Sequence, residues 1–499
     1  MKIKLSKLFT PNLLILYLVL ILGSFLRIQG ALTNSFAFTY DVGRDMLALW
    51  DIVYSHHPVL IGPTTGIPGV FYGPWWYYML APFFFIFQGD PQGIAIIMAV
   101  FGVLSIILSY FVGKKISGEF LGLAFAAVVS VSPMMISLSS QIWNPNIAPV
   151  PVLFILFLLA EIYTNKKINL VYYFCLGALM SLMLDIELVF GFLFIIGMLI
   201  AILIVKRIKL SLKAVILYLM GFILVLLPRI MFDIRHNFLM ANSFITYFKN
   251  GAEPQSLGFM ELVNSRLAVF FGDYTATVGG GNKIIGLIIL LYTIIVIVIY
   301  FSKAKDLEKT FIKISTTVLS VFILGTIFFS HDIWSHYLVG LPVFYILLFV
   351  IATGIIAIKD KRQVPLLIIV IVCLINFNPI SFVSNFGKPL WVGDASVYRN
   401  QLNVIDYVYK SANGKDFKYV VYTPPVHDYT YQYLFKWYGP KNYKYAPVEK
   451  SNLAFFIIEP DLSNPGRVAD WLKARVGDGK VVSSKVLKGG ITVQTRVNK

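Results

Sequence analysis

The stretch TYDVGRDMLALWDIVY, residues 39–54, is the first polar segment after the first long apolar run of the chain. It places two carboxylates, Asp41 and Asp45, at positions i and i+4, with Arg44 beside them. Because residues four apart lie on one face of an α-helix, a short helix here would present both carboxylates together at the boundary between lipid and water. Such a group of charges is suited to chemistry, but Asp41 could also act only as an N-terminal helix cap.

The composition of the whole chain is that of a membrane protein. Of its 499 residues, 58% are hydrophobic and 13% are charged, whereas a typical soluble chain is about 25% charged. The net charge of +17 arises from lysines clustered between apolar runs. This pattern indicates membrane orientation and attraction to anionic lipid headgroups rather than nucleic-acid binding. Cys175 and Cys373 both lie inside apolar runs, so neither a disulfide framework nor a thiolate metal site is indicated.

Apolar runs of about 20 residues, long enough to cross the hydrocarbon core of a membrane, predict about eleven transmembrane helices. The first run follows a basic start and precedes no convincing cleavage site, so we expect it to be retained as a span. The runs lie near residues 11–29, 92–113, 119–138, 147–164, 168–184, 188–205, 213–231, 284–302, 311–329, 337–358 and 364–380.

The turns between these spans predict a cytoplasmic N-terminus, because every inner turn is then basic, as the positive-inside rule requires. The basic residues on the inner side are Lys2, Lys4, Lys7, Lys114, Lys115, Lys166, Lys167, Lys206, Arg207, Lys209, Lys213, Lys303, Lys305, Lys309, Lys313, Lys359, Lys361 and Arg362. This orientation requires that residues 72–87, YGPWWYYMLAPFFFIF, do not cross. The run is short and rich in Trp and Tyr, which favour the interface. We expect a helix lying in the outer leaflet, within an outer loop of residues 30–91.

The composition changes after about residue 381, where helical and strand-like patterns begin to alternate. Helical patterns lie near 400–412, 428–437 and 465–475, and strand patterns lie at 418–423, at 453–458 and twice between 480 and 496. The fold class predicted is therefore a mostly α, polytopic membrane protein with a small soluble α/β domain. We predict a membrane module over residues 1–380 and an extracytoplasmic domain over residues 381–499.

Most remaining polar residues fall on the predicted outer side, which also contains a long loop reaching from Arg235 to about residue 283. Charges at the end of a span are costly unless they face a cavity, so Asp185 and Glu187 indicate a polar pocket. Residues i and i+2 do not share a helical face, and we favour Glu187 as the contact to a sugar or acceptor; the alternative is a loop carboxylate in water. Further candidate substrate contacts are Asn144, His336 and Tyr337, although the last two could simply anchor a span at the interface.

The order of these parts resembles that of the GT-C glycosyltransferases. Among these enzymes it is similar to the protein O-mannosyltransferases and the lipid A aminoarabinose transferases, which include glycosyltransferase family 39. The stretches that carry the resemblance are TYDVGRD (39–45), IGPTTGIPGVFYGPWWYY (61–78), SLSSQIWNPN (137–146) and FDIRHNF (232–238). Each motif is loose, and their order, which covers about residues 30–240, is more telling than any one of them.

The resemblance implies an integral membrane enzyme that uses a polyprenyl-phosphate sugar as donor. Asp41 matches the acidic residue that opens the first outer loop and is the presumed base of the family. Many members have Asp-Glu at this point, whereas this chain has Val42 in place of the Glu, which leaves Asp41, or Asp41 with Asp45, to act. Oligosaccharyltransferase-like members carry an acidic metal-binding motif in the second outer loop, but here that loop reads SSQIWNPN. We therefore predict transfer without a metal or another cofactor.

Transfer to an acceptor hydroxyl needs a base for the acceptor proton and cations for the departing phosphate. Asp41 is the candidate base, and direct displacement would invert the anomeric configuration. The candidate phosphate ligands are Arg44, Arg229, Arg235 and His236, since guanidinium groups bind phosphate oxygens in a bidentate manner. Arg235 has the strongest case because it follows the end of a span. Alternatively, Arg229, like Arg27, only anchors its span, and Arg235 only pairs with Asp233.

Two other classes of function remain open. A transporter or lipid flippase would have paired halves with broken helices and charges at mid-membrane, whereas the polar residues here concentrate on the predicted outer face. A non-catalytic envelope protein would use its C-terminal domain to bind a partner. For the enzyme, the acceptor is a protein, a lipid or a glycan.

Overall fold

The computed structural model describes residues 10–165, 169–206, 211–249, 258–329, 332–356, 363–385, 387–388, 391–424 and 427–498. Many of the basic residues that predict the orientation lie outside these ranges. They are Lys2, Lys4, Lys7, Lys166, Lys167, Arg207, Lys209, Lys359, Lys361 and Arg362.

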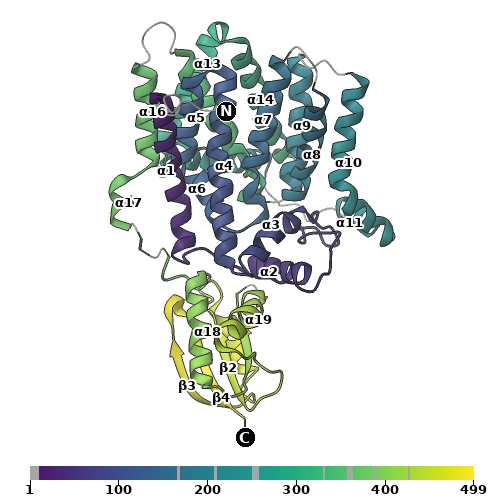
Figure 1. Cartoon of the computed structure of the whole chain (residues 1–499), viewed down its shortest axis with the longest axis vertical. Helices are drawn as coiled ribbons and strands as arrows, with labels where there is room; N and C mark the ends of the chain where they lie inside the picture. The colour runs from purple at the N-terminus through teal and green to yellow at the C-terminus, as the bar shows by residue number, and fades with distance from the viewer. Residues whose placement is uncertain are drawn as a thin grey trace, which may run out of the picture.

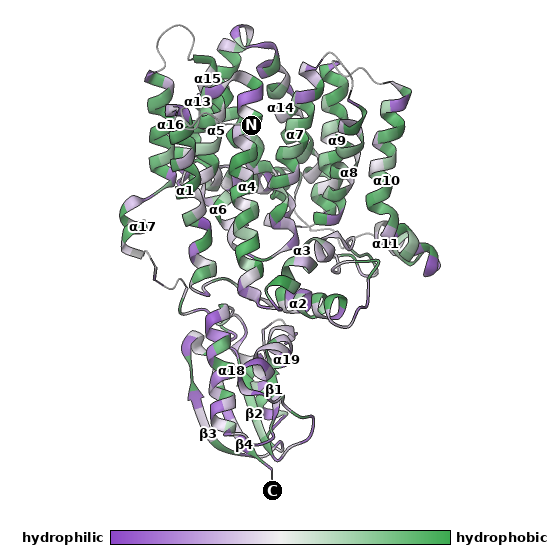
Figure 2. Ribbon diagram, in the orientation of Figure 1, coloured by the Kyte–Doolittle hydropathy of each residue, from purple (hydrophilic) through white to green (hydrophobic). Residues whose placement is uncertain are grey.

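The chain forms a bundle of long helices with a smaller α/β domain at one end (Figure 1). Apolar residues dominate the bundle helices, and polar residues are frequent in the smaller domain (Figure 2). The helices of the bundle and its surroundings are α1 (Pro11–Leu32), α2 (Tyr40–Val53), α3 (Trp75–Ile86), α4 (Pro91–Ser117), α5 (Glu119–Val131), α6 (Pro133–Ser140), α7 (Pro149–Thr164), α8 (Leu170–Ile186), α9 (Leu188–Val205), α10 (Leu212–Arg235), α11 (Leu239–Lys249), α12 (Phe259–Val278), α13 (Lys283–Tyr300), α14 (Asp306–Ile327), α15 (Leu341–Ile356), α16 (Gln363–Asn376) and α17 (Pro379–Asn385), with 3₁₀ turns at Asn144–Ile147, Phe301–Lys303 and Ser335–Leu338.

Each of the eleven predicted apolar runs contains a helix, and the predicted fold class is confirmed. Within the described residues, seven helices are long and apolar enough to cross a membrane, or eight if the bent pair α5 and α6 forms one span. The number of eleven spans stays a prediction. The protein is an integral membrane protein.

The predicted outer loop from Arg235 to about residue 283 is wrong, because this segment contains α11 and α12. Helix α12 escapes a search for apolar runs because it includes Glu261, Arg266 and Asp273. The Arg266 side chain is buried and donates to the carbonyls of Thr326 (3.1 Å) and Phe329 (2.9 Å). A charge that looks costly in the sequence is thus satisfied by distant backbone groups, which no local pattern could indicate.

The chain bends by 61° between α5 and α6, and a buried arginine compensates for the break. Pro133 has no N–H, so it cannot continue the hydrogen-bond ladder of α5. Instead, Arg27 of α1 donates to the carbonyls of Val129 (2.9 Å) and Ser130 (2.8 Å). Arg27 is 1% exposed, so its interpretation as a snorkelling anchor is wrong.

The helix predicted within residues 72–87 is present as α3, and its position in the outer leaflet stays a prediction. Its 12 residues extend about 18 Å, too short for the hydrocarbon core of about 30 Å. It lies beside α2 at the end of the bundle that faces the smaller domain (Figure 1). The indole N–H of Trp75 donates to the carbonyl of Val225 in α10 (2.7 Å), which ties α3 to the membrane helices.

The smaller domain contains a four-stranded mixed sheet in the order β1-β2-β4-β3. Strands β1 and β2 pair in parallel, while β4 pairs antiparallel with both β2 and β3. The parallel pair is joined by a helical crossover, as parallel strands require. All the elements predicted here are present, namely α18 (Tyr398–Ala412), β1 (Lys418–Tyr422), α19 (Tyr429–Tyr443), β2 (Leu453–Ile458), α20 (Pro465–Lys473), β3 (Lys480–Val486) and β4 (Thr492–Val497). The division of the chain at residue 381 stays a prediction.

This domain is joined to the bundle by backbone hydrogen bonds. No side chain caps the start of α18. Its first backbone amides instead donate to carbonyls of the loop after α1. The amide of Tyr398 donates to the carbonyl of Phe36 (3.0 Å), and the amide of Arg399 donates to the carbonyl of Asn34 (3.0 Å). Because the first amides of a helix need acceptors, the position of α18 depends on the loop that leads into α2.

We predict that Arg27→Met destabilises the protein. The substitution leaves the carbonyls of Val129 and Ser130 without their side-chain donor in a buried site, which we expect to cost about 2–5 kcal/mol. The measurement is the melting temperature of the purified protein in detergent. Lys213→Met, at the exposed first turn of α10, is the control and should melt like the wild type. Equal melting temperatures for both variants would contradict the role of Arg27.

Candidate active site

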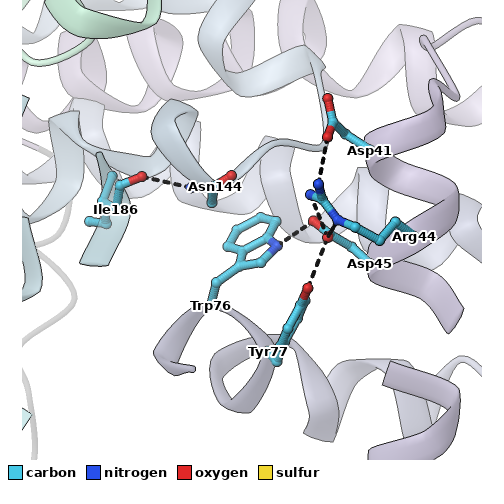
Figure 3. Close-up of polar contacts among 7 residues, drawn as sticks. All are labelled: Asp41, Arg44, Asp45, Trp76, Tyr77, Asn144 and Ile186. Atoms are coloured by element: carbon cyan, nitrogen blue, oxygen red, sulfur yellow. Dashed lines mark hydrogen bonds and ion pairs between the residues drawn. The ribbon is translucent and has the colours of Figure 1, made fainter. Parts of the chain in front are cut away.

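Helix α2 carries a compact charged cluster that a buried carboxylate holds together (Figure 3). Asp45 is 1% exposed. Its Oδ1 accepts two bonds from Arg44, from Nε (3.0 Å) and Nη2 (2.9 Å), and its carboxylate also accepts from the Trp76 indole (2.9 Å) and the Tyr77 hydroxyl (3.2 Å) of α3. Burial raises the pKa of Asp45, and the Arg44 charge opposes that shift.

Asp41 occupies the other end of the cluster. Nη1 of Arg44 lies 2.8 Å from Asp41 Oδ1, so one guanidinium joins both carboxylates on the predicted shared face. Helix α2 begins at Tyr40 and its N-cap is Thr39, so Asp41 is not the cap. The side chain of Asp41 is 22% exposed, in contrast to Asp45.

Asp41 lines a cavity of about 460 Å³ between the bundle and the C-terminal domain. Ligand-binding pockets for small molecules are commonly about 300–1,000 Å³. The bundle side of the wall comes from the start of α2 and the loop after α6, at residues 37–42 and 141–143. The C-terminal side comes from Asp394, Ala395, Ser396, Gln401, Thr423, Pro424, His427, Thr430, Glu459 and Pro460.

Sequence reasoning missed every residue of the C-terminal wall. These side chains reach the cavity only because α18 and α19 dock on the loop before α2 and on α2 itself. No Cβ fits at Gly43, because it would collide with the backbone of Tyr429 and Thr430. The absence of a side chain at this position is therefore a local signal of the docking, but its meaning appears only in the structure.

A second polar cluster lies where α8, α9 and α10 approach the loop before α3. Nη2 of Arg229 is 2.7 Å from Oδ1 of Asp185, and both side chains are buried. The alternative in which Arg229 only anchors its span at the interface is therefore wrong. The sequence favours Glu187 over Asp185 as the contact to a sugar or acceptor. The Asp185 carboxylate is packed so closely against Gly73 that a Cβ atom at Gly73 would overlap it.

Glu187 and Asn144 are also buried in this region. Glu187 is 1% exposed and accepts a hydrogen bond from the Tyr72 hydroxyl (2.6 Å), so the alternative of a loop carboxylate in water is wrong. Asn144 donates from its amide to the carbonyl of Ile186 (2.7 Å), which holds the loop after α6 against the end of α8 (Figure 3). Neither residue lines the cavity.

Arg235 and His236 lie at the end of α10 and are exposed. They do not line the cavity. The alternative in which Arg235 pairs with Asp233 is wrong, because the Asp233 carboxylate accepts instead from the backbone amides of Met240 (2.6 Å) and Ala241 (3.4 Å) at the start of α11. The His236 ring stacks on Phe232, with 4.0 Å between the ring centroids.

His336 and Tyr337 lie behind the cavity rather than in its wall. The His336 ring packs edge-on against Trp143, a lining residue, with 5.0 Å between the ring centroids, and also contacts Tyr337. Burial lowers the pKa of His336 to about 4. The ring is therefore uncharged at neutral pH and lacks the charge that would attract a phosphate.

The described part of the chain contains no group of three or more His, Cys, Asp or Glu side chains that could hold a metal ion. The carboxylates near the cavity are instead engaged by arginine, tyrosine and tryptophan donors. Metal-independent chemistry stays a prediction.

Comparison with known proteins supports the resemblance seen in the sequence. Residues 72–232 match the family model described as dolichyl-phosphate-mannose-protein mannosyltransferase.

The whole chain is similar to two crystal structures of ArnT from Cupriavidus metallidurans. The undecaprenyl phosphate complex gives a TM-score of 0.56 at 11% identity and covers 97% of this chain and 98% of that one. The apo structure gives 0.59 at 12% identity and covers 97% of each chain. A comparison with curated protein sequences gave no significant match. The predicted GT-C fold is confirmed.

We predict that Glu187 makes the stability of the protein depend on pH. Burial raises the pKa of Glu187 from 4.5 to about 7, although the Tyr72 hydroxyl and backbone amides oppose the shift. The folded chain then holds this proton more tightly than the unfolded chain, so stability falls as pH rises through this interval. Glu187→Gln can still accept a hydrogen bond from Tyr72 but does not titrate. We therefore expect the free energy of unfolding of the variant to fall by on the order of 3 kcal/mol less than that of the wild type over this pH interval.

The measurement is the difference in melting temperature between pH 5 and pH 8, for the wild type and for the variant. Glu261→Gln, at the exposed start of α12, is the control and should keep the wild-type pH dependence. If Glu187→Gln also keeps it, Glu187 is not the titrating group.

Proposed function

We propose that this chain, a membrane protein with the GT-C glycosyltransferase fold, transfers a sugar from a polyprenyl-phosphate donor to an acceptor hydroxyl on the outer face of the membrane. The family match over residues 72–232 and the fold support a glycosyltransferase with a lipid-linked donor. The observation that carries the proposal is the position of Asp41, a partly exposed carboxylate in the wall of a cavity at the end of the helix bundle.

In this proposal Asp41 is the general base. The acceptor hydroxyl gives its proton to the Asp41 carboxylate as its oxygen forms a bond to the anomeric carbon of the sugar. The bond from that carbon to the phosphate oxygen breaks on the opposite side, so the anomeric configuration inverts and polyprenyl phosphate departs. A positioned base of this kind contributes about 10²–10⁴ to the rate. No general acid is required, because a phosphate leaves readily once cations neutralise it.

We propose that Asp45 and Arg44 position the base. Asp45 is buried and uses its carboxylate for Arg44, Trp76 and Tyr77, so an acceptor cannot reach it. Arg44 holds one oxygen of Asp41 at 2.8 Å, which fixes the direction of the carboxylate. Because Asp41 and Asp45 already engage the guanidinium and the phosphate departs on the side away from the base, Arg44 is not a phosphate ligand in this proposal.

Arg235 is the proposed ligand of the donor phosphate at the lipid surface. It is exposed at the end of α10 and forms no ion pair with the part of the chain that the structure describes. Arg229, in contrast, is neutralised by Asp185. An apolar ridge along α10 runs toward Arg235 and suits a prenyl tail; its exposed members are Leu219, Ile223, Leu227, Ile230 and Ile234. His236, next to Arg235, is the remaining candidate.

The bent pair α5 and α6 is the one feature that favours a lipid or glycan transporter, because transporters bind ions at the unwound backbone of broken helices. Here the freed carbonyls of Val129 and Ser130 are occupied by Arg27, and the Ser132 hydroxyl donates to the carbonyl of Thr277 (2.7 Å). A break whose backbone groups are already bonded offers no site to an ion. We therefore favour the enzyme.

The proposed orientation has a cytoplasmic N-terminus and an extracytoplasmic C-terminal domain. The proposed reaction uses no metal and no cofactor, and its acceptor hydroxyl belongs to a protein, a lipid or a glycan. The partners are then the membrane lipid and the polyprenyl-phosphate sugar.

We predict that Asp41→Asn lowers the rate of transfer by about 10²–10⁴ with unchanged folding, because the amide cannot take the acceptor proton. The measurement is consumption of polyprenyl-phosphate sugars from a panel by the purified protein. Asp51→Asn is the matched control, since Asp51 lies on the same helix but is exposed and outside the cavity. Equal rates for Asp41→Asn and the wild type would remove the proposed base.

We predict that Arg235→Met raises the KM for the donor by about tenfold or more, because a charge-assisted contact to phosphate is worth about 1.5–3 kcal/mol. The value of kcat should fall as well, because the phosphate that Arg235 binds is the leaving group and gains negative charge as its bond to the anomeric carbon breaks. Lys249→Met, which removes another exposed cation at the end of α11, should leave the KM unchanged. A loss confined to kcat would contradict a role in donor binding.

A further inference from the structure

The cavity beside Asp41 is a joint product of the bundle and the C-terminal domain. The two parts meet through backbone contacts at Gly43 and at the start of α18, as described above. Helix α19 adds contacts to the loop before α4, where the Trp437 indole donates to the carbonyl of Gln88 (2.8 Å) and the Tyr433 hydroxyl donates to that of Gly89. The C-terminal wall is therefore held in a fixed position relative to Asp41.

The charges that line the cavity are of one sign. Three carboxylates belong to the wall, those of Asp41, Asp394 and Glu459, and the described lining residues include neither lysine nor arginine. His427 is the only basic side chain among them. The cation nearest the wall, Arg44, is already shared between Asp41 and Asp45. An anionic ligand beside Asp394 and Glu459 would therefore meet like charges, which costs several kcal/mol at a close contact.

Glu459 is held in the wall as a buried acceptor. The hydroxyl of Tyr431 (2.9 Å) and the amide of Gln401 (3.4 Å) both donate to its Oε1. No hydrogen bond to Oε2 is present among the described residues. Burial raises the pKa of Glu459 to about 6, so the carboxylate is ionised at pH 8.

Gln401 supplies a second unused acceptor at the same place. Its side chain is 2% exposed and lines the cavity, and its Oε1 is buried without a hydrogen-bond partner among the described residues. A buried carbonyl oxygen without a donor costs about 1–3 kcal/mol. A ligand that brings hydroxyl or ammonium donors to this wall would recover that energy.

The opposite wall offers aromatic surface. Tyr40 and Trp143 are partly exposed and line the cavity from the bundle side. Aromatic faces pack against apolar faces of ligands, and they also attract cations. Acceptor oxygens on one wall and aromatic rings on the other suit a ring that carries hydroxyl or amino groups at its edge and C–H groups on its faces, which describes a sugar.

We propose that this cavity is the acceptor subsite, and that it takes a neutral or amine-bearing sugar and discriminates against anionic acceptors. The inference rests on the proposed function, in which Asp41 takes the proton of the acceptor hydroxyl. Glu459 and Gln401 bind donors at the edge of the ring, while another hydroxyl of the same ring faces Asp41. The C-terminal domain thereby selects the acceptor.

The test measures binding to the full-length protein in lipid nanodiscs at pH 8, by NMR titration with three probes. These are methyl β-glucoside, methyl β-glucosaminide and glucose 6-phosphate. We expect the glucoside and the glucosaminide to bind at least about tenfold more tightly than the phosphate, because like charges repel the anion. Glu459→Gln, which keeps the shape of the side chain, should shrink the ratio between glucosaminide and phosphate by at least threefold. Glu449→Gln, at an exposed carboxylate of the same domain, should leave the ratio unchanged.

Three results would overturn the inference: equal or tighter binding of glucose 6-phosphate, the same ratio in Glu459→Gln as in the wild type, or no binding of any probe. If Glu459→Gln does not fold, Gln401→Met replaces it in the test. We expect this variant to bind methyl β-glucoside more weakly than the wild type does. The binding assay needs neither donor nor turnover. A failure of the proposed function, seen as unchanged transfer in Asp41→Asn, is therefore distinguishable from a failure of this inference.

Discussion

The buried carboxylate of Asp45 is the interaction on which the geometry of the site depends. A charge with 1% exposure survives only if donors replace its lost water. Three side chains do so here, and each has a structural consequence. Arg44 is drawn to Asp45 and so reaches Asp41, while Trp76 and Tyr77 fasten α3 to α2 (Figure 3). Helix α3 and the candidate base are thus positioned by the same anion.

The second constraint is the backbone junction between the bundle and the C-terminal domain. Residues 34–43 give carbonyls to the start of α18 and, at Gly43, allow α19 to approach α2 without a side chain between them. Contacts between backbones fix position more rigidly than contacts between long side chains, which would lose conformational freedom on docking. The cavity wall formed by Gln401 and Glu459 is consequently as well placed relative to Asp41 as the residues of α2 itself.

How much the sequence predicts depends on the range of the interaction. The spans, β2 and the cluster of Asp41, Arg44 and Asp45 are local patterns, in apolar run length or in helical spacing, and they were predicted. Helix α12 was not, because its charges are compensated by groups about 60 residues away, such as Thr326 for Arg266. The Asp185–Arg229 pair and the C-terminal wall were missed for the same reason. Such partners meet only after folding.

Among the carboxylates near this end of the bundle, the surroundings of four separate structural from chemical roles. Asp45, Asp185 and Glu187 are buried, and each is engaged by a partner that would have to be displaced before an acceptor could approach. Asp41 alone among these four combines a held orientation with 22% exposure and a place in the cavity wall. A base must be reachable as well as oriented. The three buried carboxylates therefore have structural roles. Asp41, which is partly exposed to solvent, is the one that can exchange a proton with a substrate.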